Sequence, residues 1–226
     1  IYKNGLKEMA WQRGKCVTFM AKWREDLAGN SCHVHSSLWR TADDTPAFAD
    51  SDAEDGWSQT FQRYLAGQVE LARDMTLFLA QYINSYKRFH SGSFAPTKAV
   101  WSRDYRTAGF RVVGEGCGLR VENRMPGADV NPYLAFAATI AAGLHGLNEG
   151  LAPAEEFAGN IYDNDAAAEV PLNLRDAIEV LERSAPMRSA LGDDVVEHYL
   201  HAGRWEQSEY DRRITDFELK RHFERS

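Results

Sequence analysis

One short stretch decides the fold: residues 119–125, which read LRVENRM. Side chains alternate between the two faces of a β-strand, so Arg120, Glu122 and Arg124 would share one face while Leu119 and Val121 point to the other. A surface ladder of cross-strand ion pairs has the same pattern, and each such pair is worth only about 0.2 to 1 kcal/mol. The pattern therefore predicts a half-buried strand and leaves the role of its polar face open.

A second stretch, residues 31–39, follows the same rule with other side chains and reads SCHVHSSLW. Alternation places His33, His35 and Ser37 on one face, opposite Val34 and Leu38. Two histidines at this spacing are weak evidence alone, because a half-buried strand also turns polar residues toward water. Together the two stretches predict a sheet that gathers imidazole, carboxylate and guanidinium groups on one side.

The rest of the chain predicts a mixed architecture. The turn GEGCG at 114–118 joins strand-like runs at 107–113 and 119–125 into a hairpin. Apolar residues recur every three or four positions over 57–79, which predicts one long helix, and an Ala-rich helix buried nearly all round is expected over 131–147. The lack of regular βαβ units favours the α+β class. The remaining expectations are a helix at 4–13, a strand at 15–23, a solvated loop at 41–56, a structured loop at 84–96 and three helices from 172 onward.

The composition excludes several kinds of protein. The 226 residues carry 26 Lys+Arg and 33 Asp+Glu, a formal net charge of −7, which argues against nonspecific binding to nucleic acid or to an anionic membrane. The longest mainly apolar run, 133–144, is shorter than the roughly 20 residues that cross a bilayer. Three cysteines without C-x-x-C spacing favour a reducing cytoplasm over a disulfide framework or a zinc site. Because the sequence opens without Met or a leader, we expect a piece of a longer protein.

Basic residues cluster around the predicted strands. Arg106 and Arg111 precede the hairpin turn, and residues 87–88 (Lys-Arg) lie in a loop rich in Gly, Ser and Pro, where binding sites are common. Guanidinium groups match phosphate and carboxylate oxygens in pairs, so this cluster suits a highly anionic ligand. Glu122 and His33 could hold the divalent cation that accompanies a triphosphate. The residues alone predict metal-assisted phosphoryl transfer, without the phosphate-loop or protein-kinase motifs.

Four blocks, taken in order, resemble the catalytic domain of the glutamine synthetase family: GNSCHVHSSLW at 29–39, NSYKR at 84–88, RVENRMP at 120–126 and NPYLAFAA at 131–138. The resemblance implies a curved antiparallel sheet flanked by helices, forming half of a funnel that ATP enters at one end and glutamate at the other. It also implies a Mg²⁺ or Mn²⁺ ion and a ring-shaped homo-oligomer with shared active sites. Residues 1–226 would be a catalytic domain truncated at its N-terminal side, with a mostly helical tail at 150–226.

The resemblance also assigns roles to residues, position by position. It implies that the metal is bound by His33 and Glu122, and that ATP is bound by His35, Ser37, Arg111 and Arg120. Glutamate would be held by Gly29, Arg88, Arg106 and Arg124. Of these, Arg88 would grip the α-carboxylate, and Arg106 and Arg124 would act in catalysis by contacting the transferred phosphoryl group.

Two positions depart from the family pattern. Members that use ammonia carry a glutamate in a GYEAP loop, where this chain reads GSFAP at 92–96, and the asparagine before the loop glycine is replaced by Ala28. Phe94 cannot act as a base, but its ring could contact the carbon chain or the cation of a larger amine. The departures resemble the branches that join glutamate to polyamines or ethanolamine, so we expect a γ-glutamyl amine ligase with Phe94 in the amine pocket.

Three other functions are open at this point. The first is an ordinary glutamine synthetase that uses ammonia, and the second is a non-catalytic family member that acts as a scaffold or regulator. A guanidino kinase is the third, although the His33-x-His35 strand argues against it. Because the family's other metal-ligating glutamates lie upstream of the position that matches Ile1, residues 1–226 alone are expected to be inactive.

The remaining polar residues receive structural interpretations. Tyr162 lies near the position where some bacterial members are adenylylated, but a packed or capping tyrosine is the favoured interpretation. Nothing marks a cysteine as activated, so Cys32 and Cys117 are interpreted as packing residues. The histidines on predicted helices are interpreted as structural: His145, His198, His201 and His222.

Overall fold

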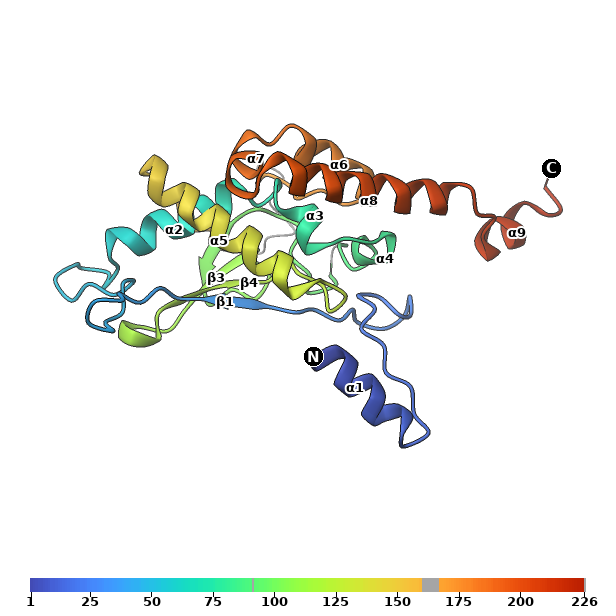
Figure 1. Cartoon of the computed structure of the whole chain (residues 1–226), viewed down its shortest axis with the longest axis horizontal. Coiled ribbons are helices and arrows are strands. Elements are labelled where there is room, and N and C mark those ends of the chain that lie inside the picture. Colours follow the sequence, from blue (N-terminus) through green and yellow to red (C-terminus); the bar gives the residue numbers. More distant parts are fainter. Residues whose placement is uncertain (91, 160–166, 226) are drawn as a thin grey trace.

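A four-stranded sheet covered on one face by helices forms the body of the protein, in a computed structural model that describes residues 1–90, 92–159 and 167–225 (Figure 1). The strands are β1 (Val34–Ser36), β2 (Trp101–Arg103), β3 (Phe110–Val113) and β4 (Arg120–Asn123), in the order β1-β4-β3-β2. The predicted α+β class is confirmed. β4 is antiparallel to both β1 and β3, as expected, whereas the unpredicted strand β2 pairs in parallel with β3.

The predicted hairpin is present, with a short 3₁₀ turn at Gly116–Gly118 between β3 and β4. The apolar side chains of residues 119–125 point into the core, where Leu119, Val121 and Met125 are buried. Their burial fixes the register, because a slip of one residue would turn the charged face of β4 inward.

Two helices, α2 (Gln59–Glu70) and α5 (Pro132–Glu149), pack tightly against each other above the sheet. A Cβ on Gly67 would lie 2.2 Å from the Ala142 carbonyl oxygen, and one on Gly143 would lie 2.0 Å from the Tyr64 ring. The single helix predicted over 57–79 is wrong in its length, because the chain turns after α2 and resumes as α3 (Thr76–Leu79). Its apolar stripe is nevertheless buried throughout, so the periodicity identified the inward face correctly.

Helix α5 begins where the sequence predicts. The Asn131 side chain accepts a hydrogen bond from the Tyr133 backbone N–H at 3.1 Å, Pro132 occupies the first turn, and the helix ends at Gly150 in the left-handed region. The expectation that it is buried nearly all round is wrong. One face, which carries Tyr133, Phe136, Ile140 and Leu144, is exposed in this chain.

The C-terminal region contains four helices in its described part rather than the three predicted: α6 (Leu174–Glu182), α7 (Ala185–Leu191), α8 (Asp193–Asp211) and α9 (Asp216–His222). Gly192 separates α7 from α8. Helix α8 packs on α6 and α7 and then extends away from the body to α9, with exposed aromatic side chains at Trp205 and Phe217 (Figure 1).

The N-terminal region also departs from expectation. Helix α1 (Tyr2–Trp11) covers most of the predicted helix, but residues 15–23 form no strand, although the Asn30 N–H donates to the Ala21 carbonyl oxygen at 2.8 Å. Residues 41–56, predicted to be a solvated loop, form mainly exposed turns, although Phe48 within this loop is buried. None of the helices in the described ranges combines the length and the apolar character needed to cross a bilayer.

Candidate active site

The polar face of the sheet is centred on Glu122 in the middle of β4. Strand pairing sets His35 of β1 and Arg111 of β3 directly across from it, one on each side. Just before β1 begins, the Cys32 N–H donates to the Pro126 carbonyl oxygen at 2.9 Å, which keeps His33 near Arg124. Strand register therefore brings together side chains up to 91 positions apart in the sequence.

Three side chains contact the Glu122 carboxylate, whose own side chain is only 5% exposed. His33 Nδ1 and Arg124 Nη1 each lie 2.8 Å from Glu122 Oε1, and Arg111 Nη1 donates to Oε2 at 3.1 Å. His35 Nε2 is farther, 3.8 Å from Oε1. We name Glu122 and these surrounding residues the Glu122 centre: His33, His35, Arg111 and Arg124.

Two pKa shifts describe the electrostatics of this centre. Burial by itself would raise the pKa of Glu122, but the hydrogen bond from Arg111 and the charges of Arg124 and the histidines outweigh it and hold that pKa below its usual range. Burial and the charge of Arg124 lower the pKa of His33, against the opposing effect of Glu122. At neutral pH the centre therefore holds a carboxylate beside a neutral imidazole.

A neutral imidazole and a carboxylate, 2.8 Å apart, are suitable donors for a divalent cation. Within the described ranges, no group of three or more His, Cys, Asp or Glu side chains could hold a metal ion. His33 and Glu122 thus fit as two ligands of a metal whose coordination requires further groups from elsewhere.

At one end of the polar face, Arg120 and His35 meet. Arg120 Nε lies 3.2 Å from His35 Nδ1, and Arg120 Nη1 donates to the Gly118 carbonyl oxygen at 2.9 Å. Ser37 is exposed one residue beyond β1, on the same side as His35.

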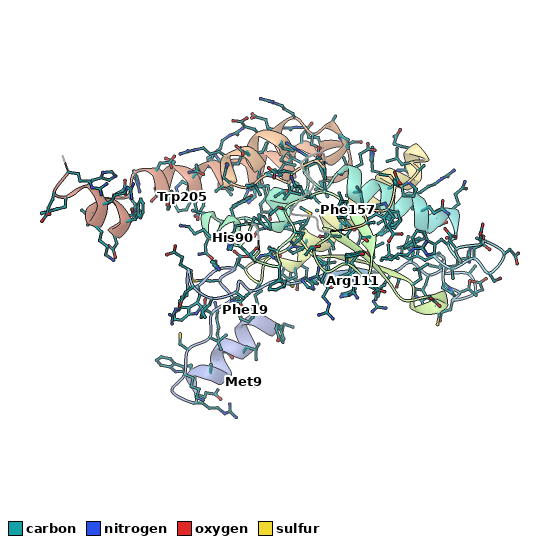
Figure 2. All side chains as sticks on the ribbon, turned by 180° about the vertical axis from the view of Figure 1, so that it is seen from behind. Met9, Phe19, His90, Arg111, Phe157 and Trp205 are labelled. Carbon is teal, nitrogen blue, oxygen red and sulfur yellow. The ribbon has the colours of Figure 1, made fainter. Side chains whose placement is uncertain are left out.

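Figure 2 shows Arg111 on the side of the body away from Trp205 of helix α8, so this face is not covered by the C-terminal helices.

At the other end, Gly29 and Arg88 are in close contact. Arg88 lies just after α4 (Ile83–Tyr86) and is only 3% exposed, and its Nη2 donates to the Met125 carbonyl oxygen. A Cβ on Gly29 would lie 2.6 Å from Arg88 Cγ, so only glycine leaves room for this side chain. The charge of Arg88 also lowers the pKa of His33, which makes the two ends parts of one electrostatic site.

Arg106 and Arg124 are connected through the backbone. Arg124 Nε donates to the Arg106 carbonyl oxygen at 3.0 Å, and the Arg106 side chain is exposed beside it. Seven of the predicted site residues are connected by contacts: His33, His35, Arg106, Arg111, Arg120, Glu122 and Arg124, with Arg106 joining through its backbone. Gly29 and Arg88 contact each other, and only the charge of Arg88 links this pair to His33.

Phe94 is 74% exposed and has a φ of 60°, a left-handed conformation that side chains other than glycine adopt at a cost. Its loop is tied to Arg88, because Ser93 Oγ donates to the Arg88 carbonyl oxygen at 2.8 Å. The structure therefore holds an aromatic side chain outward, one residue after a direct contact with the Arg88 backbone. Tyr162 lies outside the described residues.

Sequence reasoning missed some members of the site. Asp104 Oδ1 accepts from Arg111 Nη2 at 3.0 Å, and the Met125 carbonyl oxygen accepts from Arg88. Asp104 lies in an irregular turn with a φ of 60°, where no periodic pattern exists. Every residue has a backbone carbonyl, so the residue type at 125 gives no hint of the contact with Arg88. For these two reasons, neither contact could be predicted from the sequence.

The catalytic domain of glutamine synthetase is the family whose pattern matches residues 1–222, and the chain belongs to this family. Among similar proteins, a γ-glutamylethanolamide synthetase of Streptomyces coelicolor is 50% identical over 225 residues, covering 100% of this chain and 47% of the relative. A glutamate–isopropylamine ligase of a Pseudomonas species is 38% identical, covering 98% of this chain and 49% of the relative.

Ordinary glutamine synthetases are also similar, and the one from Thermus thermophilus is 35% identical, covering 98% of this chain and 51% of the relative. A solved structure named as a GmaS/ADP complex has a TM-score of 0.89 at 31% identity, with 98% of this chain and 52% of that chain covered. The chain thus spans about half the length of the relatives it matches.

Proposed function

We propose that the full-length protein is an ATP-dependent ligase that joins an organic amine to the γ-carboxylate of glutamate. The observation that carries the proposal is Phe94, an exposed aromatic side chain held outward in the loop that is tied to Arg88. Two relatives whose names state an amine ligase, at 50% and 38% identity, support it. The whole reaction requires residues beyond this chain, so residues 1–226 alone are expected to be inactive.

The proposed reaction has two steps. A γ-carboxylate oxygen of glutamate attacks the terminal phosphorus of ATP, the bond to the bridging oxygen breaks, and ADP leaves. The neutral amine nitrogen then attacks the carbonyl carbon of the acyl phosphate, inorganic phosphate leaves, and the nitrogen loses a proton. Arg106 and Arg124 offset the charge of the transferred phosphoryl group, as guanidinium groups do in other phosphoryl transfers.

The substrate positions follow from the two ends of the site. Arg88, buried and closely packed against Gly29, would hold the α-carboxylate of glutamate. His35, Ser37, Arg111 and Arg120 would bind ATP at the opposite end. A divalent ion, Mg²⁺ or Mn²⁺, bound by His33 and Glu122 would neutralise phosphate charge.

Phe94 also separates this proposal from ammonia-dependent glutamine synthesis. A phenyl ring has no ionisable group to take a proton from ammonium, but its face can contact an alkyl chain or a larger cation. A non-catalytic role is less well supported, because the Glu122 centre and Arg88 keep the groups that phosphoryl transfer would use.

The assembly and location are part of the same proposal. We infer a ring-shaped homo-oligomer with shared active sites from the membership of the chain in the glutamine synthetase family. The three cysteines are free, which is consistent with a cytoplasmic protein.

Phosphate release by the full-length protein tests the proposal, with ATP, Mg²⁺ and glutamate and with ammonium, methylamine, ethanolamine, putrescine or spermine as the amine. Higher turnover with an organic amine than with ammonium is the expected result. Ammonium as the best substrate would assign the protein to ordinary glutamine synthesis, and no turnover with any amine would favour the scaffold.

A further inference from the structure

An exposed carboxylate that the proposed reaction does not use is paired with an arginine of the Glu122 centre. Asp104 lies directly after β2, and its Oδ1 accepts a hydrogen bond from Arg111 Nη2 at 3.0 Å. The side chain of Asp104 is 85% exposed, whereas that of Arg111 is only 19% exposed. Ion pairs at the surface contribute little to stability, so the main consequence of this contact is where it holds the Arg111 guanidinium.

The backbone around Asp104 is anchored on both sides. Before it, the Arg103 N–H donates to Glu156 Oε1 at 2.7 Å. After it, the Arg106 carbonyl oxygen accepts from Arg124 Nε at 3.0 Å. Asp104 itself has a φ of 60°, a left-handed conformation that aspartate and asparagine tolerate better than most residues. The exposed carboxylate is therefore carried by a stretch of backbone that is held at both ends.

The guanidinium of Arg111 has an orientation that Glu122 alone would not select. A guanidinium and one carboxylate pair best through two parallel hydrogen bonds. Arg111 gives Glu122 only one, from Nη1 to Oε2 at 3.1 Å, and its Nε is buried without a hydrogen-bond partner in the described part of the chain. Because Nη2 is directed to Asp104 instead, the two acids together set the plane of the guanidinium.

This orientation also keeps Arg111 away from the more crowded oxygen of Glu122. His33 Nδ1 and Arg124 Nη1 each lie 2.8 Å from Glu122 Oε1. A guanidinium forked over both carboxylate oxygens would compete with His33 and Arg124 for Oε1. The bond to the exposed Asp104 instead holds Nη2 toward the surface, the side from which a ligand in solution arrives.

We propose that Asp104 is a positioning residue that holds the Arg111 guanidinium toward the nucleotide phosphates and prevents it from pairing fully with Glu122. This inference rests on the proposed binding of ATP by Arg111. Asp104 acts through Arg111 and does not itself contact the nucleotide.

The test measures the KM for ATP and the KM for glutamate of the full-length protein, with the amine that gives the highest turnover. In Asp104→Ala, the KM for ATP should rise about tenfold and the KM for glutamate should stay within about twofold of wild type, because only the nucleotide contact is misplaced. Asp104→Asn keeps an oxygen that Nη2 can bond, so it should return the KM for ATP toward the wild-type value. The matched control is Asp44→Ala, at an exposed aspartate with a φ of 54°, and it should behave as wild type.

An unchanged KM for ATP in Asp104→Ala overturns the inference, and so does an equal rise in both KM values, which indicates a general structural effect. A lower KM for ATP also overturns it, because Asp104 would then compete with the nucleotide for Arg111. So does a KM in Asp104→Asn as high as in Asp104→Ala, since the inference requires the acceptor oxygen. If Asp104→Ala does not fold, Asp104→Ser takes its place. Wild-type protein that turns over ATP with no amine and not with ammonium would instead refute the proposed function, and the inference with it.

Discussion

Two buried charges of opposite sign lie in the same site but in opposite surroundings. Glu122 is in the middle of a strand and is contacted by His33, Arg111 and Arg124, all within 3.1 Å. Arg88 is in a loop, has no ion-paired acid in the described residues, and bonds a backbone carbonyl instead. The acid is thus already paired with cations of the protein, whereas the base has no paired acid among the described residues. Under the proposed function, the comparison separates a group that organises the site from one that would bind the glutamate carboxylate.

The largest effect is expected from changing Glu122. Glu122→Gln should lower turnover by about a thousandfold, because the arginines lose their common partner and a metal loses a ligand. Glu122→Ala should also lower the free energy of unfolding by about 3 to 5 kcal/mol, since the buried Arg124 loses its counter-charge and Arg111 is left with Asp104 alone. Phosphate release and denaturant unfolding of the full-length protein measure these effects. Glu115→Gln, on the exposed turn of the same hairpin, is the control and should match wild type.

Arg88 should behave differently when it is removed. Arg88→Ala should raise the KM for glutamate about a hundredfold with little change in the KM for ATP, because one charge-assisted carboxylate contact is lost. Its cost in stability should be about 1 to 2 kcal/mol, below that of Glu122→Ala, since no acid is ion-paired with it. Initial rates and unfolding curves test both values, with exposed Lys87→Ala as the control. A stability cost larger than that of Glu122→Ala would refute the comparison.

The loop tied to Arg88 should control the choice of amine. Phe94→Glu should raise the ratio of ammonium to organic-amine turnover by about tenfold, because a carboxylate can accept a proton that a phenyl ring cannot. Phe94→Leu, which keeps an apolar side chain, should retain the preference for the organic amine. If Phe94→Glu leaves the ratio unchanged, the ring has no part in selecting the amine.

The smallest effect concerns pH and the Glu122 centre in metal-free protein. The folded-state pKa values of Glu122 and His33 are both lowered, so the unfolded chain binds protons that the folded chain does not. Their contributions to stability are therefore complete at neutral pH and are lost as the pH falls, first through the usual His range near about 6.5 and then through the Glu range near about 4.3. Unfolding in the presence of a chelator should show a loss of stability as the pH falls through the Glu range, and this part of the loss should be smaller in Glu122→Gln. An equal loss in both proteins would contradict this assignment.

The polar face of the sheet could be predicted from the sequence because strand alternation is strict. His33, His35, Arg120, Glu122 and Arg124 share a face for this reason, and burial of the opposite face fixes the register. The hairpin turn predicted that β3 and β4 are neighbours, but the register that places Arg111 across from Glu122 and the pairing of β1 with β4 had to come from the structure.

The helices show where sequence reasoning fails. Periodicity found the buried stripe of α2 and α3 but not the break between them, because the interruption at residues 71–75 keeps the same face inward. Composition suggested that α5 is buried all round, yet Phe136 and Leu144 are exposed. The apolar content of a helix does not tell which other elements pack against each of its faces.

The most direct test of the proposed ligase is a competition between amines. Full-length protein is incubated with ATP, Mg²⁺, glutamate, ammonium and an equal concentration of methylamine, ethanolamine, putrescine or spermine, and the products are identified by mass spectrometry. A γ-glutamyl amide of one organic amine in excess over glutamine is the result that this account predicts. Glutamine as the main product with every amine of the panel would contradict it.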